Sequence, residues 1–267
     1  MKRVPVLLIG ALAMAAGVIF SIVYIDPRGG SVLLSQIILG MSGGKLGFSL
    51  AELLLFVLQM FPFFIFCAIV GTSLYKHLCF SSIYIFSRHP QKIKWYTKEL
   101  LVAFCSTAFF KLLFIASTLW ITDIFYDVLW DLAGFQLLFV HFLVYSLWLY
   151  CVILSINIVA IYLGSDGAFV VVVGLQMILF TSFSLYQQGG WIEWAKLNPN
   201  AHLVMSWHGI IVDLLNLEMP VGYIYPSLDV VSSVGIMLIL AVILSLLGGV
   251  VVAKHDILMS NTETGGT

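Results

Sequence analysis

Charged residues are scarce in this chain of 267 residues. Asp, Glu, Lys and Arg make up 9% of it, apolar residues make up 61%, and the mean hydropathy is +1.09. Soluble domains carry about 25% charged residues. This composition therefore excludes a soluble domain and indicates an integral membrane protein.

Signatures of catalysis and nucleotide binding are also missing. The chain contains no HExxH motif and no paired intramembrane carboxylates. The segment GMSGGKLG resembles a phosphate-binding loop only superficially, because Leu39 and Leu46 occupy the positions of the first Gly and of the Ser or Thr. We therefore expect no catalytic residue and no cofactor in this chain.

Cysteine is rare, and its spacing predicts no metal site or disulfide framework. The four cysteines lie in or beside apolar runs without CxxC spacing: Cys67, Cys79, Cys105 and Cys151. Packing is the role that this placement favours.

Long apolar runs dominate what the chain does contain. Six of them are long enough to cross a bilayer: 4–25, 51–75, 100–122, 134–163, 168–186 and 233–253. We predict an all-α integral membrane fold with six transmembrane helices, formed by residues 1–267 as a single domain. Within it, Gly10, Ala13, Ala16 and Gly17 predict a small-residue packing face on the first span, and Pro62 predicts a kink in the second.

A shorter apolar stretch, SVLLSQIILGM, follows the first span. It is too short to cross a bilayer, and it predicts a re-entrant or surface helix that ends at Gly43 and Gly44.

The segment 76–99 determines the predicted orientation. It holds five of the twelve Lys and Arg residues, and cationic loops next to spans stay on the cytoplasmic side. The topology that follows places both termini inside and 187–232 outside, with eight of the twelve cations on the inner side. The predicted location is the plasma membrane of a bacterium.

The same basic segment contains a predicted amphipathic helix. Phe80, Ile83 and Tyr84 recur at helical spacing before the break at Pro90. Such a helix can dock a cytoplasmic partner, with Phe86 adding to the apolar contact and Arg88 at its polar rim. An interfacial anchor that contacts only lipid headgroups is the alternative.

Ionisable groups inside a membrane are costly, so Lys111 in the third span is the first candidate functional residue. His141 in the fourth span is its candidate partner. Gln59, Asn157 and Gln176 add hydrogen-bonding groups at other depths. The alternative is that these groups join helices or face a water-filled vestibule, without contacting a substrate.

The predicted outer segment, 187–232, is rich in Trp and Pro and includes Trp191, Trp194 and Trp207. Within it, an apolar stripe predicts a helix along the outer leaflet: Leu203, Val204, Trp207, Ile210, Ile211 and Leu214. His202 and His208 could suggest a metal site. However, six residues along a helix would place their imidazoles on different faces, so we favour ordinary interfacial histidines.

This layout resembles the ABC-2-type permeases. The likeness rests on six spans with both ends inside, an amphipathic helix in the first cytoplasmic loop, and a Trp-rich outer segment that passes through Asn198 and Pro199. The last span, which ends VAKHDIL, adds to it. The small permease subunits of Gram-positive exporters of antimicrobial or ribosomally made peptides are the most similar members.

The resemblance implies a membrane subunit without its own ATPase. Two such permeases, as a homodimer, would work with two separate ABC ATPase chains, on which ATP and Mg would bind. The family's coupling helix would correspond to 81–88 and its outer re-entrant region to 191–225. One departure is that only three residues precede the first span, where the family has an amphipathic helix along the inner leaflet.

Three other functions remain open from the sequence. The chain could be a non-transporting immunity or scaffold protein that acts through its outer segment. It could be the substrate-binding subunit of an uptake system, or an intramembrane enzyme built around Lys111 and His141, although no second catalytic partner is identifiable.

Overall fold

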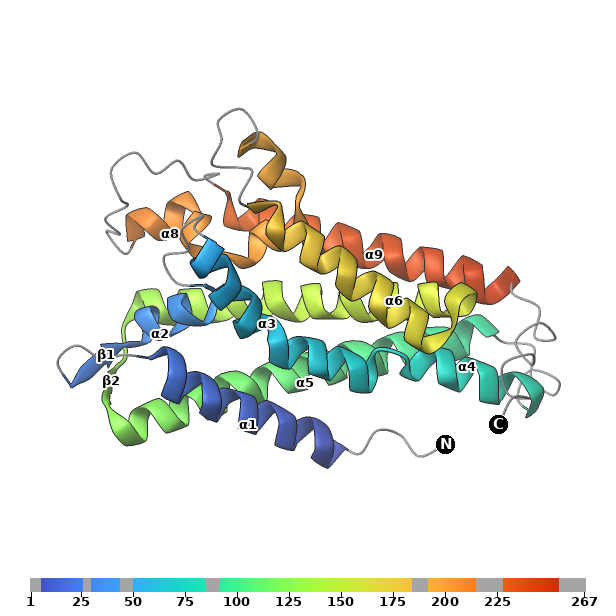
Figure 1. The fold of residues 1–267 in the computed structure, drawn as a ribbon, viewed down its shortest axis with the longest axis horizontal. Coiled ribbons are helices and arrows are strands. Elements are labelled where there is room, and N and C mark those ends of the chain that lie inside the picture. The colour runs from blue at the N-terminus through green and yellow to red at the C-terminus, as the bar shows by residue number, and fades with distance from the viewer. Residues whose placement is uncertain are drawn as a thin grey trace.

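The computed structural model describes residues 6–25, 30–43, 50–84, 92–183, 192–214 and 228–254. Within these ranges the chain is mostly helical. The long helices run roughly parallel or antiparallel to one another in an elongated bundle (Figure 1). Five of the helices are long and apolar enough to cross a membrane, so the chain is a multi-pass membrane protein by helix length and hydropathy.

The long helices follow the predicted apolar runs, with shifted boundaries. They are α1 (Val6–Tyr24), α3 (Leu50–Val70), α5 (Lys92–Phe125), α6 (Leu132–Thr181) and α9 (Val230–Lys254). α5 has 34 residues and begins well before the predicted span at 100–122. Its first two turns carry Lys92, Lys94 and Lys98 of the basic segment, because a helix whose backbone is satisfied internally can continue past the apolar core.

α6 is a hairpin of two helical arms. Gly164 has φ 74° and ψ 174°, a left-handed conformation that glycine adopts without strain. On either side of it, the indole Nε1 of Trp148 lies 3.3 Å from Oε1 of Gln176, and the rings of Trp148 and Phe180 are 6.4 Å apart. Residues 28 positions apart in a straight helix would be about 42 Å apart, so the arms run antiparallel. The turn lies within the predicted Gly164–Gly167 loop.

The second run is divided by a break that the sequence did not predict. α3 continues through Pro62, and a break at Gly71 and Thr72 separates it from α4 (Ser73–Tyr84). A β-carbon on Gly71 would collide with the carbonyl oxygen of Cys67, so the break requires glycine. Pro62 is tolerated because membrane helices lose single backbone hydrogen bonds without breaking.

Small residues bring α1 and α5 together as predicted. Ala13 and Ala16 are buried, and a β-carbon on Gly17 would meet Ser117 and lie 2.7 Å from the carbonyl oxygen of Phe114. Ser21 and Thr122 join the same two helices through a 2.9 Å hydrogen bond. This is the small-residue packing that membrane helices use in place of hydrophobic collapse.

The segment after α1 forms a strand and a short helix. β1 (Ser31–Leu33) pairs in parallel with β2 (Asp127–Leu129), and α2 (Leu34–Met41) follows and packs against α6. α2 ends at Met41 with Ser42 as its C-cap, and Gly43 follows with φ 89°, close to the predicted end. Most of α2 is buried, including Leu34, Ile37 and Ile38, which fits a re-entrant helix better than a surface helix.

One carboxylate joins the beginnings of two helices at this end. Asp131 accepts hydrogen bonds from the amides of Ser35, at the start of α2, and Gly134, at the start of α6, each at 3.0 Å. A β-carbon on Gly134 would lie 2.7 Å from the backbone nitrogen of Ser35. The anion therefore satisfies unpaired amides of both helices and interacts favourably with both helix dipoles.

The second arm of α6, from Gly164 to Thr181, is about 25 Å long at 1.5 Å per residue. It is therefore shorter than the hydrocarbon core of about 30 Å. The next described elements are 3₁₀ helices η1 (Ile192–Leu197), η2 (Pro199–Leu203) and η3 (Met205–Trp207), then α8 (Gly209–Leu214). Together, η1 to α8 form the part of the predicted outer segment that is described before α9, and we use the name outer segment for these elements from here on.

The outer segment packs into the protein. Leu203, Val204 and Trp207 of the predicted stripe are fully buried and Ile211 nearly so, whereas Ile210 is 59% exposed. The predicted helix along the outer leaflet is therefore wrong for most of the stripe. Successive 3₁₀ turns replace a regular α-helix, and these side chains fill the space above the end of α6.

We expect Asp131→Ala to lower the thermal unfolding midpoint of the protein in detergent, because both helix starts lose their acceptor. Each lost cap typically costs about 0.5 to 2 kcal/mol. Asp123→Ala is the matched control, since Asp123 is an exposed acid near the C-terminal end of α5, at the same end of the bundle as Asp131. Equal midpoints for the two variants would contradict the double-cap role.

Candidate functional site

A lysine lies at the centre of the bundle, surrounded by aromatic rings. Lys111 of α5 is fully buried. Its Nζ lies 4.1 Å from the ring centroid of Tyr145 and 4.9 Å from those of Phe63 and Phe114. The rings come from α3, α5 and α6, so three helices converge on one ammonium group. Cation–π attraction partly offsets the cost of burying it.

Nothing in the described part of the chain pairs with this ammonium. Lys111 Nζ has no hydrogen-bond partner there. The two ion pairs of the described residues lie elsewhere and join His77 to Glu99 and Lys196 to Glu193. Burying an ionisable group without a partner costs free energy. Lys111 therefore departs from the usual rules of packing.

His141 extends the same cluster. Its ring centroid is 4.2 Å from that of Tyr145, and it is fully buried. Both ring nitrogens, and the hydroxyl of Tyr145, lack hydrogen-bond partners among the described residues. Lys111, His141 and Tyr145 therefore form a buried polar cluster, which we call the central cluster. The prediction that Lys111 and His141 are neighbours is consistent with their shared contact with Tyr145.

The other predicted polar residues divide into two groups. Gln59 lies one turn before Phe63 on α3, and its buried Oε1 has no partner among the described residues. Asn157, by contrast, accepts from the amide of Tyr75 at 2.9 Å and donates to the carbonyl of Ile153 at 2.8 Å. Asn157 thus joins α4 to α6, which favours the helix-joining alternative for this residue.

Gln176 belongs to a second polar group that the sequence reasoning missed. Trp148 Nε1 donates to Oδ1 of Asn200 at 2.8 Å, and Nδ2 of Asn200 donates to the carbonyl of Gln176 at 3.3 Å. Asn198 Nδ2 donates to the carbonyl of Leu179 at 2.8 Å. Asn198 and Asn200, which we call the Asn clamp, therefore fasten the outer segment to the end of α6. The two Asn residues on either side of Pro199 were the sequence feature that could have indicated this clamp.

The tryptophans of the outer segment differ in their placement. Trp194 is 56% exposed, whereas Trp207 is fully buried with its ring 4.9 Å from that of Phe183. Trp191 lies outside the described residues.

The two outer histidines converge, contrary to the prediction that they lie on different faces. Nδ1 of His202 and Nε2 of His208 lie 2.7 Å and 2.9 Å from the same hydroxyl, Oγ of Ser233 in the first turn of α9. The prediction assumed an α-helix, but this segment follows 3₁₀ turns with extended residues between them. No group of three or more His, Cys, Asp or Glu suited to a metal occurs in the described ranges.

Three of the five predicted partner-binding residues lie at the end of α4. Phe80, Ile83 and Tyr84 belong to its last turns, while Phe86 and Arg88 fall outside the described residues. The first half of α4 is packed in a small apolar cluster of Leu74, Leu78, Tyr96 and Val252. α4 therefore contacts α5 and α9 as well as α6.

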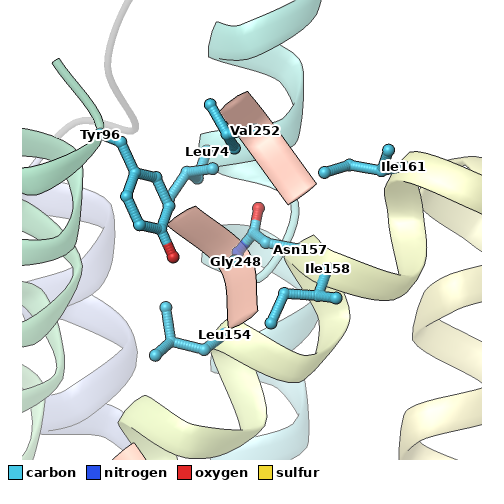
Figure 2. Close-up of a pocket in the computed structure, with 8 residues that line it drawn as sticks. All are labelled: Leu74, Tyr96, Leu154, Asn157, Ile158, Ile161, Gly248 and Val252. Carbon is cyan, nitrogen blue, oxygen red and sulfur yellow. The ribbon is translucent and has the colours of Figure 1, made fainter. Parts of the chain in front are cut away.

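A small, partly open pocket lies beside this cluster, between α4, α5, α6 and α9 (Figure 2). Its lining is mainly aliphatic, with the hydroxyl of Tyr96 and the amide of Asn157 at its edges. Tyr96 donates to the carbonyl of Ser245 at 3.1 Å, and a β-carbon on Gly248 would collide with its hydroxyl. The polar groups of this pocket are thus already engaged, unlike those of the central cluster.

The four cysteines, which all lie in the described part of the chain, form no disulfide with one another. Cys67 and Cys151 are buried in the core, as packing residues would be, whereas Cys105 is exposed.

No protein family model matches the chain, and neither a curated protein nor a solved structure shows significant similarity to it.

We expect Lys111→Met to keep or raise the thermal unfolding midpoint in detergent. Methionine has a similar length and no charge, and an ammonium near the centre of a membrane helix costs about 2.5 to 3.5 kcal/mol on insertion scales. Cation–π attraction returns about 2 kcal/mol at most. Leu112→Met, at the exposed neighbouring position, is the control. A clearly lowered midpoint in Lys111→Met alone would show that the ammonium has a stabilising partner.

Proposed function

We propose that this chain is the membrane-spanning permease subunit of an ATP-driven ABC exporter, working with a separate ABC ATPase to move a peptide or amphiphilic substrate out of the cell. In this proposal the chain crosses the bacterial plasma membrane six times, with both termini inside, because the two arms of α6 each form one crossing. It assembles as a homodimer with two ATPase chains.

The distribution of charge supports this orientation. The described residues near one end of the bundle include Lys76, Lys92, Lys94, Lys98 and Lys254. Those near the other include Asp123, Asp127, Asp131, Glu193 and Asp229, with Lys196 as the described cation. Because Lys and Arg mark the cytoplasmic side, the cationic end faces the cytosol. Trp120, Trp130 and Trp194 are exposed near the acidic end, as in an interfacial aromatic belt.

The observation that carries the proposal is α4. This 12-residue helix continues the second apolar run, which extends to Cys79, and its last turns lie at the cationic end, where a coupling element would contact its partner. Asn157 ties its start to α6, and Leu78 packs with Tyr96 of α5 and Val252 of α9. A displacement of the tip of α4 by a partner would therefore act on three long helices at once.

An energy source must come from a partner in this proposal, since the sequence contains no nucleotide-binding motif. ATP and Mg would bind to the partner chain. Uphill transport by the permease then depends on a physical contact with that chain at the cationic end.

One observation favours a second candidate, the non-transporting immunity or scaffold protein. Lys111 is enclosed by rings on several sides, and the interior of the described bundle is filled around it. A permease of this kind would have to separate helices, or use the interface between two copies, to expose Lys111 and His141 to a substrate. A scaffold needs neither change.

The proposal predicts that an ABC ATPase co-purifies with the chain after mild detergent extraction. Tyr84→Ala or Phe86→Ala should each weaken the association by about 1 to 3 kcal/mol, because binding energy concentrates in a few aromatic anchors. Lys92→Ala and Lys94→Ala are the controls and should change it little. The measurement is the amount of ATPase recovered, together with substrate-stimulated ATP turnover.

Full ATPase recovery and turnover in the double variant Tyr84→Ala, Phe86→Ala would exclude the end of α4 as the coupling element. Failure to recover any ATPase with the unchanged chain would favour the immunity or scaffold function instead.

A further inference from the structure

The outer segment and α9 are joined by a buried cluster of two histidines and one serine. His202, His208 and Ser233 are each no more than 2% exposed. The two imidazoles approach Oγ of Ser233 at 2.7 Å and 2.9 Å, and this hydroxyl also lies 2.8 Å from the carbonyl oxygen of Asp229. We call these three residues the His–Ser–His cluster.

The far nitrogens of both rings face backbone carbonyls. Nε2 of His202 is 3.1 Å from the oxygen of Lys196, and Nδ1 of His208 is 3.2 Å from that of Val204. With the contact from Oγ of Ser233 to the carbonyl of Asp229, the cluster makes five polar contacts, for which two neutral imidazoles and one hydroxyl supply three hydrogens. The neutral cluster is therefore two hydrogens short, and an added proton would supply one of them.

Burial opposes that proton. It lowers the pKa of His202, and burial with the nearby His202 imidazole lowers the pKa of His208 to about 4. Relative to the ordinary value of 6.5, the shift of His208 is much larger than the gain of one hydrogen bond, which is worth roughly one pKa unit. Burial therefore prevails, and the closed cluster is the neutral one.

The charged groups around the cluster do not reverse this balance. Asp229 precedes α9 and is exposed; its pKa is lowered because the amide and hydroxyl of Ser232 donate to it, so it stays ionised. On η1, Lys196 and Glu193 pair with each other at 2.7 Å. Among the described residues, Asp229 is thus the one unpaired charge that favours a protonated His208.

We propose that the His–Ser–His cluster is a proton-binding latch: it holds the outer segment against the first turn of α9 when neutral and releases it when a proton binds. This inference is independent of the ATPase partner and relies on the proposed topology only for the side from which the proton comes. The external medium supplies it in that topology.

The direction follows from linkage. A histidine whose pKa is lower in the closed state than in the open state contributes stability that is fully present above pH 6.5. That stability is lost progressively as the pH falls from 6.5 towards about 4. Acidification therefore opens the latch.

Two backbone contacts between the joined segments report the opening. The amide of Leu228 donates to the carbonyl of Trp207 at 2.8 Å, and that of Gly209 donates to the carbonyl of Leu228 at 3.2 Å. The amide of Asn200, which donates to Oδ1 of Asn198 at 2.9 Å, lies in the Asn clamp and does not depend on the latch. The amides of Gly209 and Leu228 thus report the opening, and the amide of Asn200 serves as an internal control.

The test is amide hydrogen exchange of the full chain in detergent at about pH 7.5 and about pH 5, expressed as protection factors that remove the intrinsic pH dependence of exchange. We expect protection at Gly209 and Leu228 to fall at least about tenfold at the lower pH, with Asn200 unchanged. The double variant His202→Gln, His208→Gln should lose this pH dependence. His77→Gln, a histidine at the other end of the bundle, should keep it.

Asp229→Asn provides a second variant that keeps the α9 cap, since Asn is also a good N-cap residue. It removes the charge that favours protonated His208 in the closed cluster, so the loss of protection at about pH 5 should be larger than in the unchanged chain. Equal protection of Gly209 and Leu228 at both pH values in the unchanged chain would overturn the latch. So would a pH-dependent loss that persists in the double histidine variant.

Discussion

The structure depends on one constraint, which is that polar groups inside an apolar fold must find their partners within the protein. The outer segment obeys it closely. Its irregular backbone lies against the protein, where Asn198 and Asn200 satisfy carbonyls at the end of α6 and the indole of Trp148. The second arm of α6 can be shorter than the hydrocarbon core for this reason, since the outer segment packs against its end.

The central cluster does not obey the constraint. Lys111, His141 and Tyr145 carry buried polar atoms without partners among the described residues, although the surrounding rings are well packed. Departures of this kind mark functional sites more often than defects. The first arm of α6 carries Tyr145 of this cluster, Trp148 beside the Asn clamp and Asn157 beside α4. A shift of this one arm would therefore move residues at the central cluster, at the Asn clamp and at the contact with α4.

The sequence predicted the long helices well, because runs of 20 or so apolar residues leave few alternatives. It also predicted the turn near Gly164. It did not predict the division of α3 from α4 at Gly71, since that break depends on a close contact with Cys67 that only the fold creates. The convergence of His202 and His208 on Ser233 was missed because 3₁₀ turns have a different period from the assumed α-helix. Phe86, Arg88 and Trp191 lie outside the described residues, so their predicted roles stay predictions.

The central claim is that the two arms of α6 cross the membrane separately and place the outer segment opposite the cationic end. The most direct measurement is labelling of single cysteines in intact cells with a membrane-impermeant thiol reagent, after replacement of Cys67, Cys79, Cys105 and Cys151 by serine. Asp166 beside the hairpin turn and Glu193 in η1 are both exposed. The account predicts that Glu193→Cys is labelled and that Asp166→Cys is labelled only after permeabilisation. Labelling of both, or of Asp166→Cys alone, in intact cells would contradict it.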